Sequence, residues 1–268
     1  MGALHDGHRS LIRAARLQCD ALVVSIFVNP AQFGPSEDFS QYPRPIARDR
    51  ALCREEGVDV CFEPTPQAMY PEGFQTIVTV PTLARRWEGA ARPHHFAGVA
   101  TVVAKLFGIV RPQLALFGQK DYQQAAVVKR LVTDLSLGLA IDIRPIIREQ
   151  DGLAMSSRNR YLSPDDRQAA TVLYRALQAG RQAIEGGKGS ASTVERIMRQ
   201  TVEQEPTARI EYLSLCDPAS LEPLEHVERS ALLLGAIRIG SVRLIDNMVV
   251  TASGRTRRSR VAPVTRGR

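Results

Sequence analysis

Residues 21–33 read ALVVSIFVNPAQF, and this stretch sets the class of fold. Its first part, residues 21–28, is an apolar run interrupted only by Ser25 and bounded by polar residues. Such a run is expected of a strand that is covered on both faces, as strands of parallel sheets are. A polar turn with Asn29 and Gln32 follows directly. The stretch therefore predicts an α/β protein with a polar loop at the end of a buried strand.

The segments around this strand alternate between strand-like and helix-like patterns up to about residue 150. Strands that alternate with helices favour a parallel sheet with helices packed against it. Further strands are expected at residues 58–63, 76–80, 113–117 and 141–147. Helices are expected at residues 46–56, 97–110 and 122–135.

The pattern changes in the second half of the chain. A long helix is expected over residues 164–184, then a glycine-rich linker at 186–190, a helix over 193–204 and strands at 209–216, 231–239 and 242–245. The last three strands could form a small antiparallel sheet. We expect residues 1–152 to form the larger α/β domain and residues 153–250 a second, smaller α+β domain.

The net charge of +7 comes almost entirely from the C-terminal end. Residues 253–268 hold six arginines and no acidic residue, so removing six charges from +7 leaves +1 for the rest. Residues 251–268 are expected to be a basic, disordered tail, because they offer few apolar side chains to bury. Such a tail could contact RNA. A tail that is merely solvated explains the basic composition more simply, so nucleic acid is not the expected partner.

Composition also bears on where the protein works. No apolar run reaches the ~18 residues that a membrane-spanning helix needs, and the first residues lack the apolar core of a signal peptide. The four cysteines show neither CxxC spacing nor a neighbouring histidine in a zinc-like pattern, and are expected to be reduced thiols. We expect a soluble, cytoplasmic protein with no membrane partner.

The motif His5-Asp6-Gly7-His8 directly precedes a good helix start at residues 9–15. The N-terminus of a helix carries partial positive charge and unpaired N–H groups, so it attracts phosphate. Two imidazoles spaced three residues apart can face the same side and donate hydrogen bonds to phosphoryl oxygens. Two surface histidines would give the same short pattern, and the motif alone leaves both interpretations open.

Two further segments could bind phosphate. Residues 117–121, FGQKD, lie where a predicted strand ends and a helix begins, the edge at which open α/β sheets place ligands. Lys120 could neutralise phosphate there, and Asp121 could accept hydrogen bonds from ribose. In residues 155–159, MSSRN, two hydroxyls and Arg158 could clamp phosphates. Taken singly, each segment could also be an ordinary polar loop.

Two glutamines lie near predicted strand ends. Gln32 follows the first strand, and Gln124 comes one turn into the helix after Lys120. An amide donates and accepts hydrogen bonds at once, so it suits a substrate with both hydroxyl and carboxylate groups. A single glutamine is usually only a surface residue, and it is the pair that makes a substrate site plausible. His94 and His95 show no ligand-like spacing, so no protein metal cage is expected.

Six stretches together resemble the pantoate–β-alanine ligase (pantothenate synthetase) family, in order and with suitable spacing over residues 1 to about 250. They are residues 1–8 (MGALHDGH), 25–33 (SIFVNPAQF), 92–99 (RPHHFAGV), 117–124 (FGQKDYQQ), 151–159 (DGLAMSSRN) and 243–247 (RLIDN). The resemblance implies a Rossmann-like nucleotidyltransferase domain with a parallel sheet, a small C-terminal domain, ATP and Mg²⁺ as cofactors, and a homodimer.

The resemblance also implies a reaction and residue roles. Pantoate would condense with β-alanine through a pantoyl adenylate, releasing pyrophosphate and AMP. The implied catalytic residues are His8, as proton donor, with His5, Lys120 and Arg158. The implied ATP-binding residues are Met1, Gly2, Ala3, Leu4, His5, Asp6, Gly7, His8, Gly118, Gln119, Lys120, Asp121, Ile147, Met155, Ser156, Ser157 and Arg158. Gln32 and Gln124 would hold pantoate, with Gln32 also near β-alanine.

This sequence departs from the family pattern in three places. Gln119 stands where an acidic residue is common, and the arginine-rich tail lies outside the pattern. The family also has a strand and a threonine just before the residue that matches Met1. We therefore expect the chain as written to lack that strand, which makes its activity an experimental question.

Two other functions compete with this one. The chain could be another HxGH nucleotidyltransferase acting on a phosphate substrate, although Gln32 and Gln124 are less suited to phosphate than Arg or Lys would be. It could also be an inactive chain whose basic tail binds nucleic acid. Pantoate-dependent AMP release would support the ligase, and salt-sensitive RNA binding without ATP binding would support the last alternative.

Overall fold

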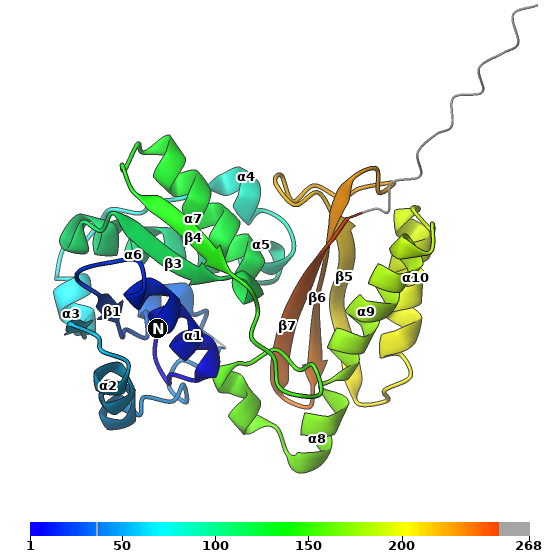
Figure 1. Ribbon diagram of the computed structural model, residues 1–268, viewed down its shortest axis with the longest axis horizontal. Helices are drawn as coiled ribbons and strands as arrows, with labels where there is room; N and C mark the ends of the chain where they lie inside the picture. The colour runs from blue at the N-terminus through cyan, green and yellow to red at the C-terminus, as the bar shows by residue number, and fades with distance from the viewer. Residues whose placement is uncertain (36, 252–268) are drawn as a thin grey trace, which may run out of the picture.

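The computed structural model describes residues 1–35 and 37–251. Its first part is an α/β unit and its second a three-stranded antiparallel sheet backed by helices (Figure 1). The basic tail predicted at residues 251–268 falls outside the described residues from residue 252 onward. The proposed domain limits at 1–152 and 153–250 stay a prediction.

The first part contains two parallel strand pairs. β1 (Val23–Ser25) pairs with β2 (Val60–Phe62), and β3 (Leu114–Gly118) pairs with β4 (Ala140–Arg144). The parallel α/β arrangement is confirmed. Among the described residues, however, the strands form two two-stranded sheets rather than one continuous sheet.

Helices cover both faces of these strands. α1 (Asp6–Arg16) and α2 (Ile46–Glu55) share a core with β1, which includes Ile12 and Val24. On the other side, α6 (His95–Val110) and α7 (Tyr122–Asp134) form a core with β3 and β4 around Val103 and Val128. Successive residues of the strands point alternately into the two cores, as expected of a sheet that is covered on both faces.

The strand predicted at residues 76–80 is wrong. Val78 and Val80 are partly buried against the cores that α6 and α7 supply, so the apolar pattern there is real. The backbone N–H of Val78 donates to the Thr101 hydroxyl of α6 at 3.0 Å rather than to another strand. Alternating apolar residues indicate one buried face, but they do not show that a neighbouring strand exists.

Short helical segments lie between these elements. They are η1 (Pro30–Gln32), α3 (Pro66–Met69), α4 (Pro81–Ala84), α5 (Glu88–Ala91), η2 (Gln119–Asp121) and η3 (Ser157–Tyr161). Three of them, η1, η2 and η3, carry residues expected to bind ligands, and η1 and η2 follow the β1 and β3 regions.

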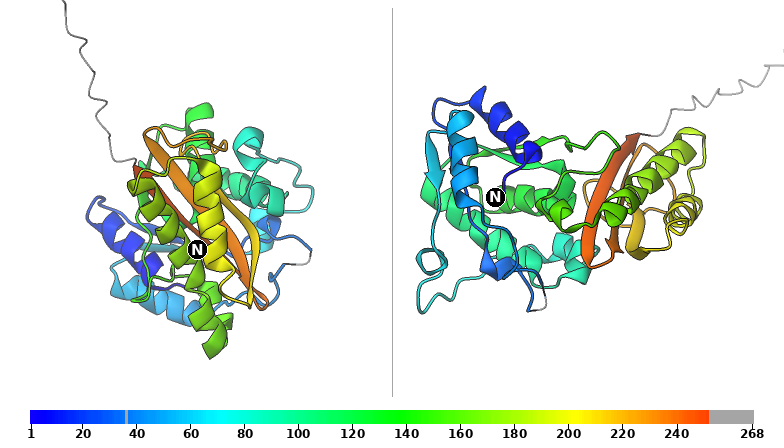
Figure 2. Two further views of the ribbon diagram at one scale, coloured as in Figure 1. Left: turned by 90° about the vertical axis from the view of Figure 1, so that its right-hand side faces the viewer. Right: turned by 90° about the horizontal axis from the view of Figure 1, so that it is seen from below.

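The second part is built on β5 (Ala208–Cys216), β6 (Ser230–Ile239) and β7 (Val242–Thr251), which pair in antiparallel order. The predicted small antiparallel sheet is confirmed. β7 is longer than expected, because all ten of its residues pair with β6. α9 (Val172–Glu185) and α10 (Ala191–Val202) pack against the sheet, and their buried side chains form the core with it (Figure 2).

The single long helix predicted at residues 164–184 is wrong. The structure has α8 (Pro164–Ala169) followed by α9, with a break at Ala170 and Thr171. The Thr171 N–H and hydroxyl both donate to the Gln168 carbonyl, at 3.3 and 2.8 Å. This local bonding tightens the turn and redirects the chain. None of the helices within 1–35 and 37–251 combines the length and apolar character that crossing a bilayer requires.

We expect Gly152→Ala to destabilise the protein strongly. Gly152 has φ +94, and a Cβ there would lie 2.0 Å from Cδ1 of the Tyr174 ring. Left-handed backbone strain and overpacking together should lower the free energy of unfolding by about 2–4 kcal/mol in denaturant titrations.

Gly187→Ala is the matched control. Gly187 has a similar φ of +87, but nothing lies within 4 Å of the added Cβ. This variant should lose only the backbone contribution, about 1 kcal/mol. Equal losses in the two variants would contradict the predicted contact with Tyr174.

Candidate active site

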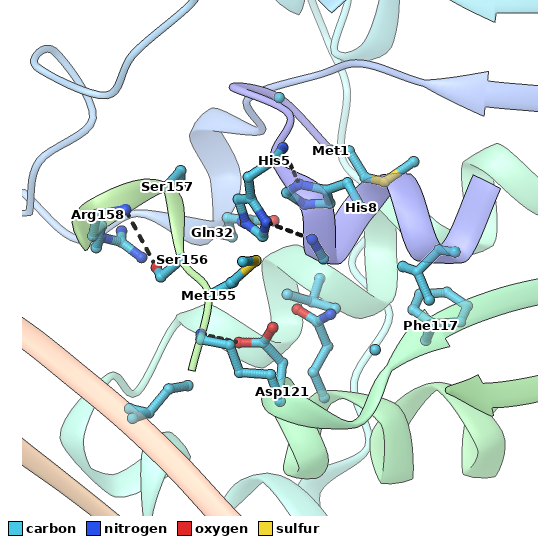
Figure 3. A pocket seen from close by; sticks show the side chains of 18 of the residues that line it. Met1, His5, His8, Gln32, Phe117, Asp121, Met155, Ser156, Ser157 and Arg158 are labelled. Carbon is cyan, nitrogen blue, oxygen red and sulfur yellow. Dashed lines mark hydrogen bonds and ion pairs between the residues drawn. The ribbon is translucent and has the colours of Figure 1, made fainter. Parts of the chain in front are cut away.

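One cavity of about 1900 Å³ brings together most of the residues that the sequence analysis selected. Its walls come from both parts of the chain. The selected residues that line it are Met1, Gly2, His5, Gly7, His8, Gln32, Gly118, Lys120, Asp121, Gln124, Ile147, Met155, Ser156, Ser157 and Arg158. Figure 3 shows the two histidines, Gln32, Asp121 and the segment from Met155 to Arg158 around this space. Ala3, Leu4, Asp6 and Gln119 do not lie on its wall.

The two histidines sit at the N-terminus of α1, as predicted. His5 is the N-cap residue, and its Nδ1 accepts a hydrogen bond from the Gly7 N–H at 3.1 Å. His8 Nδ1 accepts from the His5 N–H at 3.3 Å. In a neutral imidazole whose Nδ1 accepts, the proton is on Nε2. Each ring therefore offers an Nε2–H donor, and the ring centroids are 4.1 Å apart.

Both imidazoles are neutral near pH 7. Burial, with a smaller contribution from the Lys120 charge, lowers the pKa of His5 to about 4. Burial and the neighbouring His5 lower the pKa of His8 well below its ordinary value. The positive charge of the site therefore comes from other groups, and the two histidines can act as neutral hydrogen-bond donors.

A buried carboxylate that the sequence analysis missed holds the loop before α1. Asp49 of α2 is fully buried, and its two oxygens accept the N–H groups of Ala3 and Leu4, both at 2.8 Å. Ala3 has a left-handed φ of +49, which costs energy in a non-glycine residue. Asp49 lies 46 positions after Ala3 and 45 positions after Leu4 in the sequence. No local sequence pattern therefore predicts these contacts.

Lys120 lies in the η2 turn, directly after β3. Its Nζ is 3.7 Å from an oxygen of Asp121. Asn247 of β7 braces the turn, because its Nδ2 donates to the Gln119 and Lys120 carbonyls, each at 2.9 Å. Asn247 belongs to the family stretch at residues 243–247, but no local sequence pattern predicts this contact.

The segment from Met155 to Arg158 contacts Asp38 and Tyr42 in the loop before α2. Arg158 makes a two-point ion pair with Asp38, at 2.9 and 2.7 Å, and Ser157 Oγ lies 2.7 Å from the Tyr42 hydroxyl. Burial would raise the pKa of Asp38, but the Arg158 pair keeps it below its ordinary value. Arg158 is therefore already matched by a carboxylate.

Gln32 ends the η1 turn, and α6 supports it. The Gln32 carbonyl accepts from Arg92 Nη2 at 3.1 Å and lies 3.0 Å from His95 Nδ1. Gly98 permits the close approach, since a Cβ there would lie 2.2 Å from the Ala31 carbonyl oxygen. Asn29 Nδ2 donates a hydrogen bond to Gln32 Oε1 at 3.3 Å. His95 belongs to the family stretch at residues 92–99, but no local sequence pattern predicts that it supports Gln32.

Comparison with known proteins identifies the family of this chain. Residues 1–249 match the family described as Pantoate-beta-alanine ligase. The chain belongs to this family. The resemblance predicted from the six stretches is thereby confirmed.

Individual family members show how far the similarity extends. A pantothenate synthetase of Heliobacterium modesticaldum is 53% identical over 93% of this chain and 89% of its own length. The crystal structure of the Thermus thermophilus enzyme matches with a TM-score of 0.90 and 50% identity, over 92% of this chain and 90% of that one.

A more distant relative was solved with ligands. The structure of the pantoate-beta-alanine ligase from Francisella tularensis, complexed with beta-gamma ATP and beta-alanine, has a TM-score of 0.76 and 34% identity. The match covers 93% of this chain and 87% of that one. The fold expected of a nucleotidyltransferase domain with a smaller second domain is thus confirmed.

The His5 environment predicts a pH effect on stability. The unfolded chain protonates His5 near pH 6.5, whereas the folded, ligand-free protein does so only near pH 4. Stability that is fully present above pH 6.5 should therefore decline as pH falls towards 4. His5→Asn keeps a good N-cap but removes this titration, so its melting temperature should fall less steeply over that range.

His226→Asn controls for the loss of one histidine, because His226 is exposed and does not line the cavity. Its thermal unfolding curves between pH 4 and 7 should follow those of the wild type. An unchanged pH dependence in His5→Asn would show that His5 does not carry the effect.

Proposed function

We propose that this chain condenses pantoate with β-alanine to form pantothenate, using ATP and releasing AMP and pyrophosphate. The observation that supports it most is the convergence on one cavity of a histidine-capped helix N-terminus, Lys120, the Ser156–Arg158 segment and two glutamines. The Francisella tularensis relative, solved in complex with beta-gamma ATP and beta-alanine, supports the choice of these two substrates.

The wall divides into two kinds of surface. The Nε2–H groups of His5 and His8, the Lys120 ammonium and the Arg158 guanidinium would hold phosphates, with the hydroxyls of Ser156 and Ser157. We assign the nucleotide to the wall that also includes Met1, Gly2, Gly7, Gly118, Asp121, Ile147 and Met155. The backbones of Ala3 and Leu4, with Asp6 and Gln119, would support this wall from behind it.

The amide side chains suit the other substrates. Gln32 and Gln124 line the same cavity from η1 and α7, and an amide can donate to a carboxylate while it accepts from a hydroxyl. We assign pantoate to both glutamines and β-alanine to the neighbourhood of Gln32.

The chemistry proceeds in two displacements. A pantoate carboxylate oxygen attacks the α-phosphorus of ATP, the bond to the bridging oxygen breaks, and pyrophosphate leaves with pantoyl adenylate formed. The neutral amine of β-alanine then attacks the acyl carbon, the bond from that carbon to the phosphate oxygen breaks and AMP leaves, and the nitrogen releases a proton to water as the amide forms. Neutral His8 donates a hydrogen bond from Nε2 to the phosphate oxygens, where charge accumulates, and Lys120 and Arg158 stabilise that charge.

Mg²⁺ fits this site as a partner of the phosphates. Within residues 1–35 and 37–251, no group of three or more His, Cys, Asp or Glu side chains could hold a metal ion alone. Mg²⁺ is usually bound through phosphates and one or two carboxylates, and Asp121 is a carboxylate on the cavity wall beside Lys120. When bound, it would neutralise phosphate charge.

We also infer a homodimer in the cytoplasm, from membership of the family. Sedimentation equilibrium of the whole chain tests the first part, and fractionation of cells that produce the protein tests the second.

The reaction is tested by measuring AMP and pantothenate with all three substrates present. Omitting β-alanine should stop AMP release but leave pantoate-dependent exchange of labelled pyrophosphate into ATP, since the first displacement is reversible. Exchange that depends on a phosphorylated acceptor instead of pantoate would replace this proposal with the other HxGH chemistry.

Lys120→Ala and His8→Ala should each lower kcat/KM about 100-fold, equivalent to about 3 kcal/mol, as when one donor to a developing anion is lost. Steady-state rates with ATP varied provide the measurement. Lys188→Ala, in the loop after α9, and His226→Ala are matched controls outside the cavity. Wild-type kcat/KM in both site variants would refute the assigned roles.

A further inference from the structure

Two adjacent residues of β7 reach two different segments of the active site. Asp246 and Asn247 are 5% and 3% exposed, although both side chains are polar. Buried polar side chains are expected to be hydrogen-bonded. Their partners lie about 100 and 128 residues earlier in the chain.

The Asn247 amide satisfies the turn that carries Lys120. Its Nδ2 donates to both the Gln119 and the Lys120 carbonyls, and its Oδ1 accepts from Gln119 Nε2 at 3.3 Å. A primary amide has two N–H donors on one nitrogen, so a single side chain can serve both carbonyls. These two bonds fix the backbone from which the Lys120 side chain extends.

The Asp246 carboxylate holds the other segment through Arg148. The two Arg148 Nη atoms donate to it at 2.5 and 2.9 Å. Arg148 Nη1 also donates to the Gly152 carbonyl at 3.0 Å, and its guanidinium lies 4.4 Å from the centre of the Tyr174 ring.

Arg148 therefore organises a narrow loop. Arg148 and Ala154 form an antiparallel bridge, and the Met155 N–H donates to the Ile147 carbonyl at 3.0 Å. The chain leaves this loop directly into Ser156, Ser157 and Arg158. The loop shape set by Arg148 thus determines where those three residues begin.

We propose that Asp246 and Asn247 are positioning residues that fix the spacing between the Lys120 turn and the Ser156–Arg158 segment, so that both segments reach the same triphosphate. The proposal rests on the proposed function, because it presupposes ATP in this cavity. Neither side chain needs to touch ATP, since each acts through the backbone or through Arg148.

Hydrogen–deuterium exchange of the ligand-free protein tests the two braces separately, without need of activity. Asn247→Leu keeps most of the volume but removes both donors, and should speed exchange about tenfold in peptides covering 118–124, as expected for about 1.4 kcal/mol of lost bonding. Asp246→Asn keeps the shape but removes the charge, and should speed exchange in peptides covering 148–158. Each variant should leave the other segment near wild type, so each is a control for the other.

Steady-state kinetics test the consequence for ATP. Both variants should raise the KM for ATP about tenfold while the KM for pantoate changes little, a split that general loss of folded protein would not produce. Val249→Ala, at an exposed position on the same strand, should match the wild type in both readouts. Asn247→Ser replaces Asn247→Leu if the leucine variant does not fold.

Wild-type exchange at 118–124 in the Asn247 variant, or at 148–158 in the Asp246 variant, would overturn the proposal. So would exchange that rises evenly over the whole chain, or KM values that rise equally for ATP and pantoate. If the wild type makes no pantothenate, the proposed function fails, and the exchange pattern still decides whether the two residues hold these segments.

Discussion

The Asp49 carboxylate is the contact on which the geometry of the site depends most. It receives two backbone N–H groups from the loop before α1, and it is fully buried. A buried carboxylate requires such partners, and buried backbone N–H groups require an acceptor. The loop before α1 and Asp49 of α2 thus satisfy each other's hydrogen-bonding groups. The position of α2 therefore determines the position of His5 and His8. Ala3 keeps its left-handed backbone conformation because the Asp49 contact and the core around Ile12 together fix this loop.

In the cavity, the groups that supply positive charge differ from those that supply neutral hydrogen-bond donors. Lys120 and Arg158 supply positive charge, whereas burial keeps His5 and His8 neutral. A neutral imidazole avoids repulsion with Lys120 and still offers an N–H donor. Arg158 pairs with Asp38 through Nε and Nη2, at 2.9 and 2.7 Å, so a carboxylate already compensates the charge of this guanidinium. The site therefore tolerates a concentration of cations without a bound ligand.

The features that could be predicted from sequence are those that local chemistry determines. The apolar run at residues 21–28 predicted a buried strand, and the spacing of His5 and His8 before a helical pattern predicted the N-terminus of α1. The strand at 76–80 was wrong because apolar alternation is the same whether the partner is a strand or a helix. The helix at 164–184 was wrong because one threonine, Thr171, bonds back to Gln168. Asp49 and Asn247 were missed since their partners are distant in sequence and neither contact leaves a local pattern.

The position of Asp246 and Asn247 in β7, the last strand within residues 1–35 and 37–251, has a consequence for biosynthesis. A ribosome releases the Lys120 turn and Arg148 long before it adds residues 246 and 247, so both segments emerge without the partners that later hold them. The α/β part can acquire its own core at that stage, as N-terminal units commonly do during translation. The Lys120 turn and the Ser156–Arg158 segment receive their common support only when β7 joins β6. The order in which the chain is made thus places the bracing of these two segments after the synthesis of β7.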